Sequence, residues 1–151
     1  MRIVLASDHA GFALKGAIGE YLAPSEHTVV DLGTFSTEPV DYPPICARAA
    51  REVVSGRADL AVVVGGSGQG EQIAANKVRG ARAALCHDEY TARFARLHND
   101  ANVLSLGARL LAPELACAIL EVFLTTAFEG GRHVARLEEL RDIEDEESGR
   151  P

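Results

Sequence analysis

An apolar run that leads into closely spaced glycines constrains this chain more than any other feature. Residues 60–64 read LAVVV, with no alternation of apolar and polar positions. Such a run predicts a strand buried on both faces, as in a parallel sheet. Glycines follow at positions 65, 66, 68 and 70, and the alanine-rich segment from Glu71 predicts a helix. A strand, a glycine turn and a helix start direct backbone N–H groups at one point and favour an anion there.

The glycine spacing argues against two familiar nucleotide sites. A dinucleotide site needs G-x-G-x-x-G after the first strand, and the glycines here have another spacing and follow a mid-chain strand. Gly65 and Gly70 fit a Walker loop, but Glu71 replaces its lysine and would repel a triphosphate. The loop would suit a small transient anion with a carboxylate beside it, which is what an enediolate and its general base require. An ordinary glycine-rich turn explains the loop equally well at this point.

Length and charge restrict the classes of protein. A chain of 151 residues predicts a single domain over residues 1–151. No apolar run approaches the roughly 20 residues of a membrane span, so we expect no membrane partner. The first predicted strand follows Met1 directly and leaves no room for a signal peptide, which predicts a cytoplasmic protein. The net charge of −7 gives no support for a nucleic-acid partner, although residues 138–147 carry most of it and the remainder is nearly neutral.

Cysteine and histidine spacing predicts no metal site. The three cysteines, Cys46, Cys86 and Cys117, are far apart and form no C-x-x-C pair, which fits reduced thiols. None of the five histidines pairs with another at i, i+4, and no H-E-x-x-H motif occurs.

Apolar periodicity predicts strands that alternate with helices. The predicted strands cover residues 2–7, 27–32, 60–64, 81–86 and 102–106. This order predicts an α/β fold, a Rossmann-like doubly wound sheet of five parallel strands with helices on both faces. A last helix over residues 130–145 has an apolar stripe (Val134, Leu137, Leu140) with no face of the sheet left to cover. We expect that helix to dock on a partner subunit, and residues 146–151 to fray.

Ligands of such sheets bind beyond the carboxyl ends of the strands. That rule selects polar residues after four strands: Asp8 and His9, Ser67 to Glu71, Cys86 and His87, and Arg109. His98 and Asn99 precede the fifth strand, so only a long loop or a neighbouring subunit would bring them to the same place. Arg132 and Arg136 lie four residues apart and could grip one phosphate or form a solvated surface pair.

Several motifs together resemble one family. They are S-D-H-A-G-F at residues 7–12, G-G-S-G-Q-G-E with I-A-A-N-K at 65–77, R-L-H-N-D-A-N-V-L at 96–104, G-A-R at 107–109 and F-E-G-G-R-H at 128–133. In this order they resemble ribose-5-phosphate isomerase type B, of the ribose/galactose isomerase family, up to about residue 140. The resemblance implies a cofactor-free aldose–ketose isomerisation of D-ribose 5-phosphate and D-ribulose 5-phosphate in the pentose phosphate pathway, through a cis-enediolate. It also implies a phosphosugar as the partner and a homodimer, and it leaves a tetramer open.

The resemblance also implies roles for single residues. Many members carry a cysteine base where this chain has Ser67, and the chain is similar to the actinobacterial branch in which Glu71 is the base and Ser67 assists. His98 would open the sugar ring, Asp8 would handle the other proton, and Asn99 would position the substrate. The loop residues Gly66, Gly68, Gln69 and Gly70 would hold the enediolate with Ser67 and Glu71, and the phosphate would bind His9, Arg109, Arg132 and Arg136.

Two alternatives remain beside this reading. One is an isomerase of galactose 6-phosphate or allose 6-phosphate, which differs in the depth of the pocket between Arg109 and Glu71. The other is a non-catalytic phosphate-binding module of the flavodoxin-like kind. A physical tension also remains, because a helix N-terminus lowers the basicity of a carboxylate such as Glu71, and a dry pocket would have to restore it.

Overall fold

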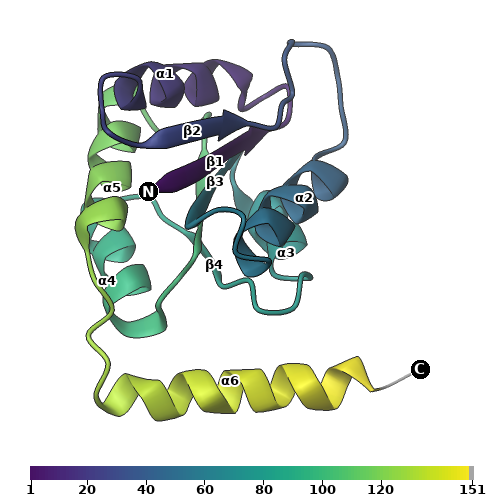
Figure 1. Ribbon diagram of the computed structural model, residues 1–151. Coiled ribbons are helices and arrows are strands. Elements are labelled where there is room, and N and C mark those ends of the chain that lie inside the picture. The colour runs from purple at the N-terminus through teal and green to yellow at the C-terminus, as the bar shows by residue number, and fades with distance from the viewer. Residues whose placement is uncertain (150–151) are drawn as a thin grey trace.

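The computed structural model describes residues 1–149 and contains one sheet of five parallel strands in the order β2-β1-β3-β5-β4 (Figure 1). The strands are β1 Arg2–Ser7, β2 Thr28–Asp31, β3 Leu60–Gly65, β4 Ala83–Leu85 and β5 Val103–Gly107. The helices are α1 Phe12–Leu22, α2 Tyr42–Val54, α3 Gln69–Ala75, α4 Glu89–Asn99, α5 Pro113–Thr125 and α6 Arg132–Ser148. The predicted doubly wound α/β fold is confirmed. Among residues 1–149, no helix combines the length and the apolar character needed to cross a membrane.

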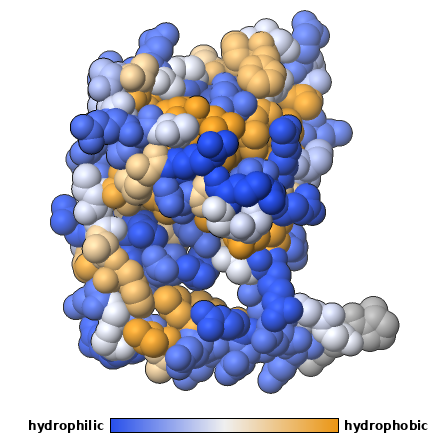
Figure 2. Space-filling view, viewed as in Figure 1, coloured by the Kyte–Doolittle hydropathy of each residue, from blue (hydrophilic) through white to orange (hydrophobic). Residues whose placement is uncertain are grey.

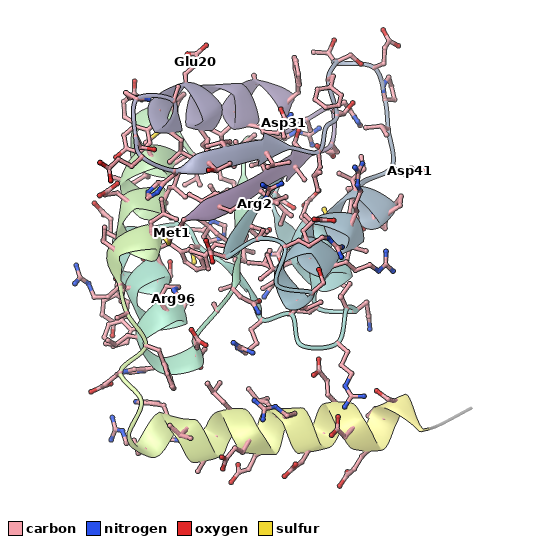
Figure 3. All side chains as sticks on the ribbon, viewed as in Figure 1. Met1, Arg2, Glu20, Asp31, Asp41 and Arg96 are labelled. Atoms are coloured by element: carbon pink, nitrogen blue, oxygen red, sulfur yellow. The ribbon has the colours of Figure 1, made fainter. Side chains whose placement is uncertain are left out.

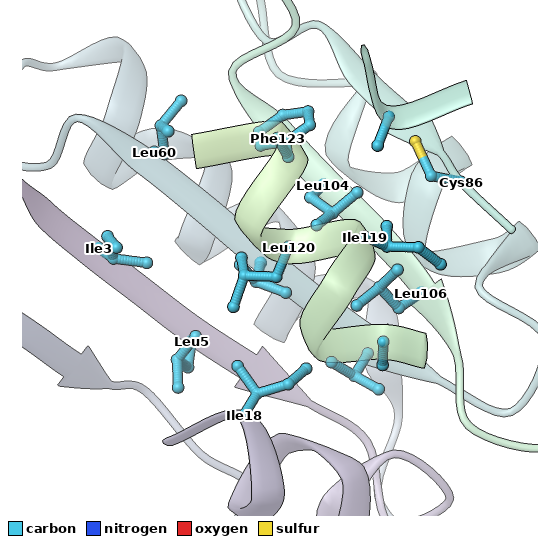
Figure 4. Packing of buried hydrophobic residues seen from close by; sticks show 14 of the residues in the cluster. Ile3, Leu5, Ile18, Leu60, Cys86, Leu104, Leu106, Ile119, Leu120 and Phe123 are labelled. Carbon is cyan, nitrogen blue, oxygen red and sulfur yellow. The ribbon is translucent and has the colours of Figure 1, made fainter. Parts of the chain in front are cut away.

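Each face of the sheet has its own core, because side chains alternate along a strand. Ile3 and Leu5 of β1 face α1, α4 and α5, where Ile18, Leu120 and Phe123 are buried (Figure 4). The opposite face carries smaller side chains, among them Val4, Ala6 and Val63 of the sheet and the alanines of α2 and α3. The small side chains let α2 and α3 approach the sheet closely, which brings the start of α3 next to the end of β3.

Helix α2 begins at Tyr42, because Pro43 and Pro44 occupy first-turn positions where no backbone N–H is needed. The end of helix α6 differs from the sequence prediction. Helix α6 continues to Ser148, so the predicted frayed tail is wrong for residues 146–148. The acidic helix end is held by contacts with the body: Arg79 pairs with Asp145, and the Gly80 N–H donates to Glu144 Oε1 at 3.0 Å. Residues 150–151 of that predicted tail lie outside the described residues.

Helix α6 lies apart from the sheet and encloses a hollow. Figures 1 and 2 show it as a bar alongside the rest of the domain, and a cavity of about 630 Å³ lies between it, α4 and the edge strand β4. Leu137 and Leu140 of α6 line this cavity, together with Tyr90 and Phe94 of α4. Val134, Leu140 and Ile143 remain 42%, 52% and 56% exposed. The apolar residues of α6 are therefore not covered within one chain.

Candidate active site

The carboxyl ends of β1 and β3 meet at the switch in strand order. From β1 the chain crosses to β2 on one side, whereas β3 leads on to β4 and β5 on the other. In such sheets the crevice beyond this point binds the ligand. Asp8 lies there directly after β1, and residues 66–71 follow β3. Asp8 is buried and its Oδ1 accepts a hydrogen bond from the Gly11 N–H at 2.9 Å.

The carboxylate of Glu71 rests on the bare Cα of Gly65. A Cβ added to Gly65 would lie 1.8 Å from Glu71 Oε1, so no other residue fits beneath the carboxylate. The turn that returns the chain over β3 depends on Gly68, whose φ of +77° is in the left-handed region. Glu71 is only 4% exposed as a result.

Burial makes Glu71 more basic than an ordinary glutamate. Desolvation is the largest influence and raises the pKa of Glu71, and the nearby charge of Asp8 raises it further. The backbone amides of Glu71 and Gly68 oppose this effect and lower the pKa. The net shift is upward, so burial outweighs the start of the helix in the isolated chain. Burial is the largest influence on the Cys46 thiol, whose pKa is raised to about 12. The charges of Glu71 and Asp8 contribute to this increase. An uncharged thiol therefore lies near both acids.

Close contacts fix the glycine loop against β5. The buried Ser105 Oγ donates to the Gly68 carbonyl at 2.7 Å. A Cβ on Gly107 would lie 2.7 Å from the Ser67 carbonyl oxygen, so the two backbones touch. The Ser67 side chain is exposed, and its Oγ accepts a hydrogen bond from the Gln69 N–H at 3.3 Å. Ser67 thus exposes its side chain on a turn that is packed against β5.

His9 and Arg109 border the same crevice. The Val40 N–H donates to His9 Nδ1 at 3.2 Å, which leaves Nε2 as the protonated nitrogen of a neutral ring. The Arg109 guanidinium lies over Gly66, with its Cζ 3.3 Å from the position that a Cβ there would take. Tyr42 covers Gly70 in the same way, at 2.5 Å. One imidazole and one guanidinium therefore lie near the glycine loop as candidate anion ligands.

The other predicted residues form a second group at the start of α6. His98, at the end of α4, stacks on His133 with ring centroids 4.0 Å apart and an interplanar angle of 14°. Arg132 Nε lies 3.5 Å from His133 Nε2, and Arg136 Nη1 lies 3.3 Å from His133 Nδ1. Asn99 follows His98 directly and lines the cavity beneath α6.

The two groups lie at opposite ends of the sheet. Asp8 and Glu71 follow the carboxyl ends of strands, whereas His98 ends the helix that leads back to the start of β5. Helix α4 has 11 residues, a length of roughly 16 Å. The structure therefore assembles each group but does not join them within one chain.

The second group contains a set of metal-ligand residues that the sequence did not predict. His98, Glu129 and His133 place their donor atoms within 4.8 Å of one another. Imidazole binds a metal in the plane of its ring, and two nearly parallel stacked rings do not direct their lone pairs at one point. Two arginines against His133 also disfavour a cation. The trio does not fit a metal site.

Sequence reasoning missed several residues of the site. Ser105 could have been recognised, because it is a polar residue within the apolar strand VLSLG. Glu129 and His133 both belong to the motif F-E-G-G-R-H, but neither was given a role. Tyr42 and Cys46 gave no signal, because they reach the site only through the packing of α2 against α3.

A doubly wound parallel sheet with a buried basic carboxylate and the Arg109 guanidinium at its switch point is typical of an α/β enzyme that handles a small anion. Residues 3–140 match the family model described as Ribose/Galactose Isomerase. Ribose-5-phosphate isomerase B of Mycobacterium leprae is 45% identical over 146 residues, which are 95% of this chain and 90% of that protein. The chain belongs to the ribose/galactose isomerase family.

Solved structures agree with this assignment. Ribose-5-phosphate isomerase B of Clostridium thermocellum superposes with a TM-score of 0.95 at 44% identity, over 97% of this chain and 99% of that one. The Mycoplasma genitalium isomerase B, solved with bound ribulose-5-phosphate, gives a TM-score of 0.91 at 40% identity, over 96% and 97% of the chains.

The raised pKa of Glu71 predicts a pH-dependent gain in stability on substitution. Above the folded pKa, folding must hold a desolvated carboxylate, whereas the protonated form at low pH carries no such cost. Glu71→Gln should therefore raise the melting temperature at about pH 8, and the gain should shrink towards about pH 4, near the pKa of an unfolded glutamate. Thermal unfolding at both pH values measures this. Glu139→Gln, an exposed residue of α6, is the control, and an equal gain in both variants would contradict the assignment.

Proposed function

We propose that this protein interconverts D-ribose 5-phosphate and D-ribulose 5-phosphate through a cis-enediolate. The observation that carries the proposal is the buried Glu71 carboxylate, whose pKa is raised by desolvation and which lies beside a rigid glycine loop. A general base works best when its pKa approaches the working pH. Full-length relatives that carry the name ribose-5-phosphate isomerase B support the same substrate. Three free cysteines fit a cytoplasmic location.

The proposed chemistry moves four protons and needs no cofactor. Asp8 takes the proton of the anomeric hydroxyl, the C1–O4 bond breaks, and His98 gives a proton to O4. Glu71 then removes the C2 proton and returns it to C1, while Ser67 assists the transfer between O1 and O2. Backbone amides of the loop around Gly66, Gly68, Gln69 and Gly70 stabilise the enediolate charge. No metal takes part in these steps.

Binding of the phosphate, away from the reacting carbons, positions C1 and C2 of the sugar. His9 and Arg109 hold the phosphate from one side, and Arg132 and Arg136 from the other, while Asn99 positions the sugar. Binding energy from such a dianion can be used to align C1 and C2 with Glu71.

The active site is completed by a second copy of the chain. Within one chain, an 11-residue helix separates His98 from the carboxyl ends of the strands, and a pentose phosphate is shorter than that helix. The exposed apolar residues of α6 and the hollow beneath it offer the surface for the partner. A homodimer would bring His98, Asn99, Arg132 and Arg136 of one chain to Asp8 and Glu71 of the other, and a tetramer would pair two such dimers.

A direct assay tests the reaction and its base. The protein should convert ribose 5-phosphate to ribulose 5-phosphate with EDTA present. Glu71→Gln should lower kcat by about 100-fold or more with little change in KM, because it removes only the proton acceptor. Ser67→Ala should cost clearly less. An inactive Ser67→Ala beside an active Glu71→Gln would overturn the assignment, and faster turnover of galactose 6-phosphate or allose 6-phosphate would favour those sugars instead.

Ring opening can be measured separately from enolisation. Ribulose 5-phosphate has no furanose form, because its O5 is phosphorylated, so exchange of its C1 hydrogen with solvent needs only Glu71. His98→Asn should therefore slow conversion of cyclic ribose 5-phosphate by about 100-fold and leave this exchange nearly unchanged. Equal losses in both measurements would make His98 a binding or structural residue.

Subunit mixing tests the shared site. An Arg132→Ala/Arg136→Ala variant and a Glu71→Gln variant should each be inactive alone. After subunit exchange, each hybrid dimer should contain one site built from two intact halves, and its activity should approach half that of the wild-type dimer. Mixtures that remain inactive after proven exchange would place the arginines in the pocket of their own chain.

A further inference from the structure

Glu129 lies against the histidine that the proposed function uses for ring opening. Its Oε2 is 3.6 Å from His98 Nε2 and 3.4 Å from His133 Nε2. The two histidines come from different helices, α4 and α6, and Glu129 lies in the segment that precedes α6. One carboxylate thus faces both rings.

The backbone of Glu129 is fixed against α4. The Glu129 N–H donates to the Leu97 carbonyl at 2.9 Å, so the residue is bonded to the turn of α4 that carries His98. Gly130 and Gly131 follow with φ values of +70° and +56°, a conformation that lets the chain turn directly into α6. His98 itself is confined between the edge of Phe94, at 4.7 Å, and the face of His133. The ring of His98 and the backbone that carries the Glu129 side chain are therefore held together.

The distance between Glu129 and His98 is that of an electrostatic contact. At 3.6 Å between Oε2 and Nε2, the contact is longer than a hydrogen bond but within range of an ion pair with a protonated ring. The carboxylate therefore faces the Nε2 edge of His98, so a proton for the sugar would leave from Nδ1.

Among residues 1–149, the structure places the Glu129 carboxylate against this ring and against His133. The pKa of His133 is lowered, chiefly by burial and then by His98 and Arg132, while Glu129 acts against this shift. The lowered pKa disfavours a second cation against the face of His98, at a centroid distance of 4.0 Å. Arg132 Nε donates to His133 Nε2 at 3.5 Å and Arg136 Nη1 lies 3.3 Å from His133 Nδ1, so an arginine N–H group faces each nitrogen of the adjacent ring.

We infer that Glu129 is a positioning residue for ring opening, which orients the His98 ring that delivers a proton to O4 of the sugar. The inference rests on the proposed isomerase function. In the step itself, the C1–O4 bond breaks, O4 takes the proton from His98 Nδ1, and Asp8 takes the proton of O1. Glu129 gains and loses no proton and touches no substrate atom in this step.

Glu129→Gln keeps the size and removes the charge. In the wild-type background, conversion of ribose 5-phosphate and C1-hydrogen exchange of ribulose 5-phosphate are measured first, and failure of both would reject the proposed function itself. The variant should then lose about tenfold in kcat for ribose 5-phosphate, with unchanged exchange at C1 and an unchanged KM. Glu129→Asp, which keeps the charge on a shorter side chain, should recover part of the loss.

A second readout separates positioning from general damage. When ring opening becomes slower than enolisation, the deuterium isotope effect at C2 of ribose 5-phosphate should decrease in Glu129→Gln relative to the wild type. Glu139→Gln, which removes an exposed charge from α6, should leave both rates and the isotope effect unchanged. Unaltered conversion in Glu129→Gln, or a parallel loss of conversion and exchange, would overturn the inference.

Discussion

Contact between the Glu71 carboxylate and the bare Cα of Gly65 is the constraint on which the rest of the site depends. A side chain on the last residue of β3 would occupy the place of the Glu71 carboxylate, which reaches back from the first turn of α3. Gly68 supplies the left-handed turn, and Gly107 on β5 lets Ser67 approach. These glycines exist because backbone and carboxylate occupy the space of their missing Cβ atoms. The loop is consequently compact, and it buries an acid that an open turn would leave in water.

That burial decides the chemistry of Glu71. A carboxylate at the start of a helix is normally stabilised as the anion, and the amides of Gly68 and Glu71 do act in that direction. Desolvation together with the charge of Asp8 outweighs them in the free chain. Closure of the pocket is therefore not required to make Glu71 basic, although the exclusion of water by a partner subunit would act in the same direction.

The sequence predicted the fold well, because each strand has either a continuous apolar run or a clear turn after it. It predicted the end of α6 less well, because this acidic helix end is held by Arg79 and Gly80, residues distant in sequence. The site residues after strands could be selected by the topological rule. Glu129 could not, since neither its type nor its spacing shows that it faces His98; that relation arises from the bond between its backbone and Leu97. Cys46 likewise reaches the acids only through helix packing.

The two groups of residues differ in the electrostatic environment that each provides. At the carboxyl ends of the strands, burial and the neighbouring Asp8 disfavour the charged form of Glu71, so Glu71 is ready to take up a proton. At the start of α6, the Glu129 carboxylate faces the His98 imidazole, and burial lowers the pKa of the adjacent His133. A proton acceptor and a proton donor in direct contact would pair with each other and lose their reactivity. Their separation at opposite ends of one sheet prevents that pairing in the single chain, and the proposed assembly of two chains would place them on opposite sides of the sugar phosphate.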